Sequence, residues 1–267
     1  VVLAAITATV VFGGISRIAK VASALVPSMS ILYLGTVATA IALNFEAVPS
    51  AFALIIHDAF TGEAVAGGGL LAVILYGVRR GAYSNEAGMG TESMAHGAAR
   101  TREPVREGLV AMLGPVIDTL LICSATAMMI LISGVWQNGD AAGVTLTANA
   151  FSALLGPVGT VIVFICVICF ATTTIFTYSF YGSQCTGFIF GADNKRRYLY
   201  IYVSFILVAS VISIDAAVSI IDASFALMAI PTMVSALWLA PKVVQAAEDY
   251  WSRIQGQTDK AHKVNNP

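Results

Sequence analysis

Charged residues are scarce in this chain: they make up 11% of its 267 residues, whereas 58% are hydrophobic. Soluble globular domains carry about 25% charged and roughly 45–50% apolar residues. The mean hydropathy of +0.83 points the same way, so we predict an all-helical integral membrane protein with the lipid bilayer as its surroundings. The net charge is −1 and no basic stripe is present, so nucleic acid is not an expected partner.

Residues that usually build catalytic and metal sites are also few, with four cysteines and three histidines. Cys166 and Cys169 form a C-x-x-C pair without a His or acidic residue nearby, so we interpret the cysteines as apolar helix residues. His57 and Asp58 are adjacent, but no nucleophile accompanies them, and a solvated loop pair is the preferred interpretation. We therefore expect neither an enzyme active site nor an organic cofactor.

Long apolar runs dominate the rest of the chain. A helix needs about 20 apolar residues to cross a bilayer. On this rule the sequence predicts seven spans, at 1–16, 25–43, 70–99, 108–135, 157–182, 198–214 and 223–240. The chain opens at Val1 inside an apolar run, so we interpret it as the carboxyl-terminal part of a longer protein.

Basic residues alternate between the segments that join these spans, and twelve of the fourteen fall on one side. By the positive-inside rule that side is cytoplasmic. We expect residues 1–240 to form a transmembrane bundle and 241–267 a cytoplasmic tail that begins with an interfacial helix. The two outer loops are expected to carry short helices near 49–60 and 148–155.

A polar, glycine-rich patch, S-N-E-A-G-M-G at residues 84–90, interrupts the third predicted span. Irregular backbone at membrane depth persists only where protein or a cavity surrounds it, which is typical of the broken helices of transporters. Asn85 lies at the centre of 70–99, near the expected midplane, and a half-helix beginning near Thr91 would present its amino end to the gap. The alternative is a glycine-rich helix contact in which Asn85 and Glu86 bond inside the bundle.

Two arginines, Arg79 and Arg80, precede this patch inside the same span. Charges at such depth are costly and usually face a pathway or a partner. Glu86 is a candidate partner for either arginine, as an ion pair or gate. His96, which follows the patch, has no partner at ligand spacing, and a packing role is preferred for it.

Hydroxyl groups cluster at Thr172, Thr173, Thr174 and Thr177, midway along the span 157–182. Thr173 and Thr174 could supply neutral oxygen ligands to a small cation. Thr174 and Tyr178, spaced i and i+4, share a helix face that could meet a bound solute. The alternative is that these hydroxyls bond the carbonyls of their own helix.

One carboxylate, Asp118, falls inside the predicted span 108–135. An ionisable residue inside a membrane is a functional-site hypothesis by default. Asp118 is a candidate cation ligand, a protonation site, or a residue that orients Asn85.

The run R-G-A-Y-S-N-E-A-G-M-G at 80–90, followed by Ala95 and His96, resembles the signature R-G-[VA]-[FY]-S-N-E-A-G-[LM]-G…A-H of the alanine or glycine:cation symporter family, within the amino acid-polyamine-organocation superfamily. The resemblance implies a leucine-transporter-like fold of inverted five-helix repeats, of which this chain would hold core helices four to ten. The first three core helices, and with them half of each binding site, would belong to a missing amino-terminal half.

The same resemblance implies sodium-coupled or proton-coupled uptake of alanine, glycine or similar small neutral amino acids across the inner membrane. It assigns Ser84, Asn85, Gly88, Thr174 and Tyr178 to substrate binding, and Thr173 with Thr174 to the sodium ion. The alternative function is a transport-silent membrane scaffold or sensor that keeps this fold.

Overall fold

The computed structural model of the chain describes residues 1–60, 70–86, 88–137, 141 and 143–265. Every regular element in these ranges is a helix. In chain order the elements are α1 (Val2–Val11), α2 (Gly14–Leu43), η1 (Phe45–Ala47), α3 (Val48–Phe60), α5 (Leu70–Asn85), α6 (Thr91–His96), α7 (Pro104–Ala111), α8 (Leu113–Pro115), the π-helical η2 (Val116–Cys123), α9 (Ser124–Ser133), η3 (Val135–Gln137), α10 (Gly143–Phe190), α11 (Asn194–Ala209) and α12 (Ile214–Asn265).

Within the described ranges, four helical stretches are long and apolar enough to cross a membrane: Gly14–Leu43, Pro104–Ser133, Gly143–Phe190 and Ala216–Gly256. They agree with the predicted all-helical membrane protein. The count of seven spans stays a prediction, because α5 and α11 have 16 residues each and a full crossing takes about 20.

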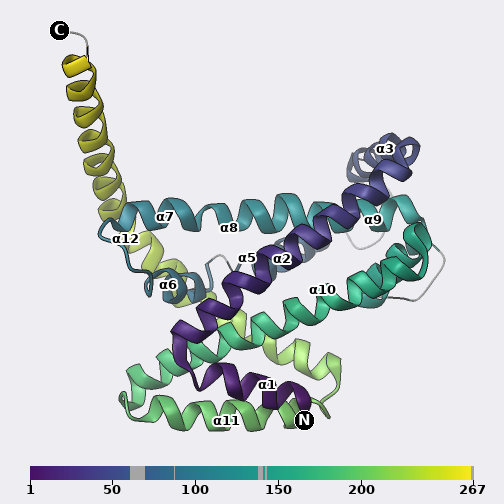
Figure 1. Cartoon of the computed structure of the whole chain (residues 1–267), viewed down its shortest axis with the longest axis horizontal. Coiled ribbons are helices and arrows are strands. Elements are labelled where there is room, and N and C mark those ends of the chain that lie inside the picture. The colour runs from purple at the N-terminus through teal and green to yellow at the C-terminus, as the bar shows by residue number, and fades with distance from the viewer. Residues whose placement is uncertain (61–69, 87, 138–140, 142, 266–267) are drawn as a thin grey trace. The chain divides into compact units, whose positions relative to one another are not determined.

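The chain divides into two compact units. Unit 1 comprises Val1–Gly81 and Val116–Ile212, and unit 2 comprises Ala82–Pro115 and Ser213–Pro267. In unit 1, α2 packs along α10 and α9, and α1 packs against α2, α10 and α11 (Figure 1). The core of this unit consists of Met29, Tyr33, Val37 and Ala40 from α2, Met129 from α9, and Phe151, Val163 and Cys166 from α10.

The first helix break lies earlier than the sequence predicted. α1 ends at Val11 and α2 begins at Gly14, whose φ is +74°. The predicted connection around Arg17 and Lys20 is instead helical, because both side chains favour helix. The Arg17 guanidinium donates a hydrogen bond of 2.8 Å to the Thr9 carbonyl, which ties the two helices together across the break.

The two short helices that were predicted beside the loops are confirmed. One is α3, Val48–Phe60. The other is the first part of α10, which runs from Gly143 to a kink at Gly156, where φ is +65° and ψ is −156°. Pro157 follows the kink, and because proline has no N–H it commonly starts a new helical section.

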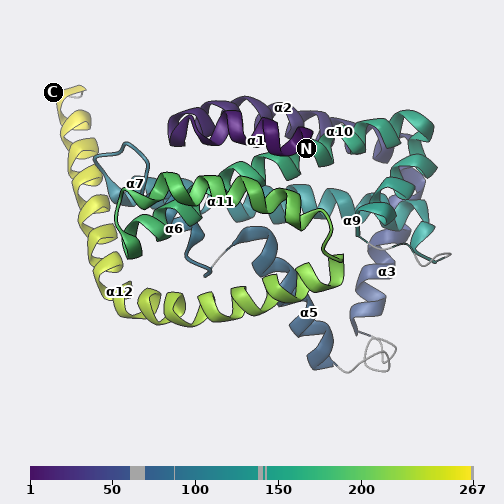
Figure 2. The same cartoon turned by 90° about the horizontal axis from the view of Figure 1, so that it is seen from below.

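Unit 2 is built on α12, against which α7 packs, while α6 packs against α7. Residues 241–265, predicted to form a tail, continue α12 without a break in the helix. Pro231 and Pro241 lie inside α12, and the helix changes direction along its length (Figure 2), as proline causes. The interfacial position of this tail stays a prediction.

Candidate functional site

The predicted helix break is confirmed, and it has a defined backbone. α5 ends at Asn85 and α6 begins at Thr91, with Gly90 as its N-cap. Positive φ angles occur at Glu86 (54°), Gly88 (80°) and Gly90 (86°). Among the described residues, Glu86 is the only non-glycine with a positive φ, a conformation that costs roughly 1–2 kcal/mol for a residue with a Cβ. Strain of this kind gathers at functional sites.

The break is held against α12. A Cβ on Gly88 would overlap the Met233 methyl group, and a Cβ on Gly90 would lie 3.1 Å from Thr232 Oγ1. One turn before the break, the Tyr83 ring packs on Phe225 with 4.9 Å between ring centroids. The two glycines are therefore needed both for their φ angles and for the close approach of α12.

Buried hydroxyls flank the break. Thr91 is 2% exposed, and neither its Oγ1 nor the buried Tyr83 hydroxyl has a hydrogen-bond partner in the described part of the chain. A buried polar atom left without a partner costs about 1–3 kcal/mol. Between these two residues in the sequence, Asn85 and Glu86 are half-buried, whereas Ser84 is exposed. A polar solute could therefore satisfy the two buried hydroxyls of Tyr83 and Thr91.

The chain that follows the break carries polar contacts that sequence reasoning missed. His96 Nδ1 lies 2.8 Å from Glu107 Oε1 on α7, so the packing role preferred for His96 is replaced by a polar contact. Arg253 of α12 donates two hydrogen bonds, of 3.0 and 2.9 Å, to the Glu103 carboxylate just before α7. No local pattern signals a pair that lies 150 residues apart in sequence.

The threonine cluster lies on α10, midway between Pro157 and Phe190. Thr173 is buried and its Oγ1 donates to the carbonyls of Cys169 and Phe170, at 2.9 and 3.0 Å. Thr172 and Thr177 bond their own helix in the same way. Thr174 is exposed, and within the described chain its hydroxyl has no hydrogen-bond partner. The alternative of own-helix bonding therefore holds for three of the hydroxyls and not for Thr174.

Tyr178 lies one turn after Thr174 and is half-buried, with its ring edge-on to Tyr181 at 5.5 Å between centroids. Thr174 and Tyr178 thus share a face of α10, as predicted. Thr173 points into the core of unit 1, so it does not share that face.

Asp118 lies in the π-helical segment η2, at the middle of the membrane-length stretch Pro104–Ser133. Segments of π-helix inside longer helices are frequent at functional sites. The side chain is half-buried in unit 1.

A hydrogen bond of unit 1 was also missed. Tyr33 is 5% exposed, and its hydroxyl lies 2.6 Å from Thr126 Oγ1, which itself donates to the Ile122 carbonyl at 2.8 Å. Since Thr126 has one hydroxyl proton, Tyr33 is the donor in the first bond. A tyrosine within the predicted span 25–43 was the available signal.

The predicted residues fall into two groups. Ser84, Asn85, Glu86 and Gly88 lie together at the break in unit 2; Arg79, Arg80, Asp118, Thr173, Thr174 and Tyr178 belong to unit 1. Arg80 donates to the Tyr76 hydroxyl at 3.0 Å, with its guanidinium 5.1 Å from the centre of that ring. The joining of the two groups in one site, and the ion pair of Glu86 with an arginine, stay predictions.

The sequence of this chain was compared with protein families and with curated proteins. A model of the sodium:alanine symporter family matches residues 1–264. An uncharacterized transporter of Haemophilus influenzae is 35% identical over 260 residues, which is 96% of this chain and 57% of that protein. The sodium/alanine symporter AgcS of Methanococcus maripaludis is 35% identical over 255 residues, 93% of this chain and 55% of that protein.

A probable sodium/glutamine symporter, GlnT of Bacillus subtilis, is 33% identical over 253 residues, 93% of this chain and 52% of that protein. The chain spans about half the length of the curated relatives it matches.

Proposed function

This chain belongs to the sodium:alanine symporter family, and on that premise we propose that the full-length protein is a cation-coupled symporter of small neutral amino acids. The family is one of transporters and not of enzymes. Sodium is the proposed coupling ion, since relatives carry sodium/alanine and sodium/glutamine in their names. A proton is the alternative ion, because another relative is named a sodium/proton-dependent alanine carrier.

The break between Asn85 and Thr91 carries this proposal. It combines strained backbone, close packing on α12 and two buried hydroxyls that have no partner among the described residues. We assign Asn85, with Ser84 and the backbone near Gly88, to the polar groups of the amino acid. Thr174 and Tyr178, on one face of α10, are assigned to the same substrate.

For the ion we assign the oxygens of Thr173 and Thr174, with Asp118 as the next candidate. The Thr173 hydroxyl donates its proton to backbone carbonyls. Its oxygen therefore keeps a lone pair that a cation could use. Thr174 has an exposed hydroxyl that requires no rearrangement before it binds.

The proposed setting is a multi-pass protein of the cytoplasmic membrane with a cytoplasmic carboxyl terminus, as the alternation of basic residues supports. Its fold is proposed to be the leucine-transporter-like inverted repeat. Since the relatives are nearly twice as long, we assign the rest of the substrate and ion sites to a preceding half of the protein. Alternating access would then arise from movement between repeats.

Uptake of labelled alanine and glycine by the full-length protein, with and without a sodium gradient, tests the proposal. Asn85→Ala is expected to abolish uptake at normal membrane expression, because a midplane amide contacts polar cargo. Asn44→Ala is the matched control, since the Asn44 amide bonds the Ala40 carbonyl of its own helix at 2.9 Å. Wild-type uptake in Asn85→Ala would contradict the assignment, and binding without accumulation in the wild type would favour a scaffold or sensor.

A further inference from the structure

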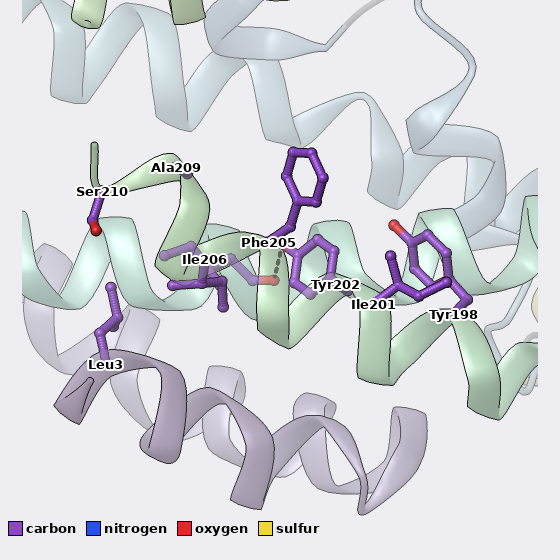
Figure 3. Close-up of a pocket in the computed structure, with 9 residues that line it drawn as sticks. Leu3, Tyr198, Ile201, Tyr202, Phe205, Ile206, Ala209 and Ser210 are labelled. Carbon is purple, nitrogen blue, oxygen red and sulfur yellow. Dashed lines mark hydrogen bonds between the residues drawn. The ribbon is translucent and has the colours of Figure 1, made fainter. Parts of the chain in front are cut away.

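A groove of about 590 Å³ opens on the surface of unit 1, between α1, α10 and α11. One face of α11 forms most of it, with Leu3 of α1 and Ile175 of α10 completing the walls (Figure 3). The residues from α11 and the turn after it are Tyr198, Ile201, Tyr202, Phe205, Ile206, Ala209 and Ser210. Their spacing of three and four residues marks a single continuous stripe along the helix.

The groove has little to offer a polar occupant. The Tyr202 hydroxyl donates to the Ile175 carbonyl at 2.8 Å, and the Ser210 hydroxyl donates to the Leu207 carbonyl at 2.7 Å. With these two hydroxyls already bonded, the remaining walls are aliphatic and aromatic carbon apart from the Tyr198 hydroxyl at one end. Phe205 is 59% exposed and Ile201 62% exposed. A hydrocarbon chain matches such walls, because its burial leaves no polar group unpaired.

One end of the groove is basic. Tyr198, at that end, directly follows Lys195, Arg196 and Arg197 in the first turn of α11. Lys195 donates to Gln184 Oε1 at 2.7 Å, and Arg197 donates to Asn194 Oδ1 at 3.2 Å; Arg196 and Arg197 are exposed. Asp193, at the N-cap, is the only acidic residue in this turn and its approach.

A second helix brings more positive charge to the same end. The Phe12 ring, just after α1, packs on Tyr200 with 4.7 Å between centroids. Arg17, at the start of α2, bonds the Thr9 carbonyl of α1. The opposite end, at Ala209 and Ser210, has no charged residue among the lining residues that the structure describes. The groove is therefore apolar along its length and positive at one mouth.

The length of the groove fits one leaflet of a bilayer. From Tyr198 to Ser210 the helix rises about 18 Å at 1.5 Å per residue, and half of a hydrocarbon core is about 15 Å. We propose that this groove binds one acyl chain of an anionic phospholipid, with its phosphate at Arg196 and Arg197. A zwitterionic lipid offers the same tail and lacks the net charge, so the basic mouth selects between them.

The test uses the full-length protein in nanodiscs made with equal parts of phosphatidylglycerol and phosphatidylcholine. Lipids retained after transfer to detergent are counted by native mass spectrometry. The wild type is expected to retain phosphatidylglycerol, and Arg196→Gln with Arg197→Gln to weaken its binding by about tenfold or more. Ala209→Phe, which fills the apolar end, is expected to lower retention while leaving both arginines in place.

Arg100→Gln with Arg102→Gln removes the same charge from exposed positions of unit 2 and is expected to retain lipid as the wild type does. Equal retention of both lipids by the wild type would overturn the proposal, as would equal losses in the two double variants. A third test measures how fast a maleimide labels the introduced cysteine of Phe205→Cys, with the label quantified on the peptide that contains this residue. Labelling is expected to rise once lipid is stripped, and protection that persists would assign the groove to a protein segment instead.

Discussion

Gly88→Ala should destabilise the protein by about 2–3 kcal/mol, although it adds a single methyl group. One part of the cost is conformational: φ is +80° at this position, and a residue with a Cβ pays roughly 1–2 kcal/mol there. The other part is steric, because the new Cβ would overlap the Met233 methyl on α12. Overpacking of this kind costs about 1–3 kcal/mol, and the flexible end of a methionine places it towards the lower value.

The two parts can be separated. Adding Met233→Ala removes the overlap and leaves the φ angle unchanged, so the double variant should be more stable than the sum of the two single changes predicts, by about 1 kcal/mol. In the Met233→Ala background, Gly88→Ala should then cost roughly 1–2 kcal/mol, which is the conformational part. Such a coupling energy is what a double-mutant cycle measures for residues in contact.

The assay is the free energy of unfolding of the full-length protein in mixed detergent micelles, with uptake measured in parallel. Gly77→Ala is the matched control: it lies inside α5, and nothing approaches its Cβ within 4 Å. It should be neutral or stabilising by up to about 1 kcal/mol, because alanine is the better helix former. If Gly88→Ala proves as stable as Gly77→Ala, or if the cycle shows no coupling, the packing of the break on α12 is refuted.

Three further changes probe the remaining features. Thr174→Val should raise the sodium concentration for half-maximal uptake by about tenfold, or ~1.4 kcal/mol of ion affinity. The affinity for alanine should fall in parallel, because linkage is reciprocal. If the sodium dependence is unchanged in Thr174→Val and also in the double variant with Thr173→Val, the ion site would be reassigned to Asp118. Tyr33→Phe should cost about 0.5–1.5 kcal/mol of unfolding free energy through its lost bond to Thr126, and full wild-type stability would argue against that bond. Glu86→Gly should raise stability by up to about 1 kcal/mol by relieving its positive φ, and a loss of stability would show that the carboxylate holds the break in place.

Features that rest on local pattern were predictable from the sequence. Glycines and polar residues in an apolar run located the break, and the start of α6 at Thr91 agrees with the prediction. The short helix predicted near 49–60 agrees with α3. In both cases the residues that decide the structure are neighbours in the chain, so a pattern of a few residues contains the information.

Other features depended on contacts that no local pattern records. The packing of Met233 over Gly88 joins residues far apart in sequence, as does the pairing of Glu103 with Arg253. The early break at Gly14 was missed because the charged residues that follow it suggested a loop, although arginine and lysine are good helix formers. The own-helix bonding of Thr173 could be stated as an alternative from the sequence, but the burial of its side chain in unit 1, which depends on the tertiary fold, could not.

The kink of α10 has a mechanical consequence. With φ of +65° and ψ of −156°, Gly156 adopts a backbone that is essentially reserved for glycine. The approach of Gly159 to the Phe151 carbonyl closes the inner corner, and Ala150 and Phe151 are completely buried. The corner is therefore closely packed, and we expect the short arm of α10 to turn together with the long arm, which carries Thr174. Such a tilt would also disturb the contact of the Phe151 ring with Tyr33 of α2, whose ring centroids lie 5.5 Å apart.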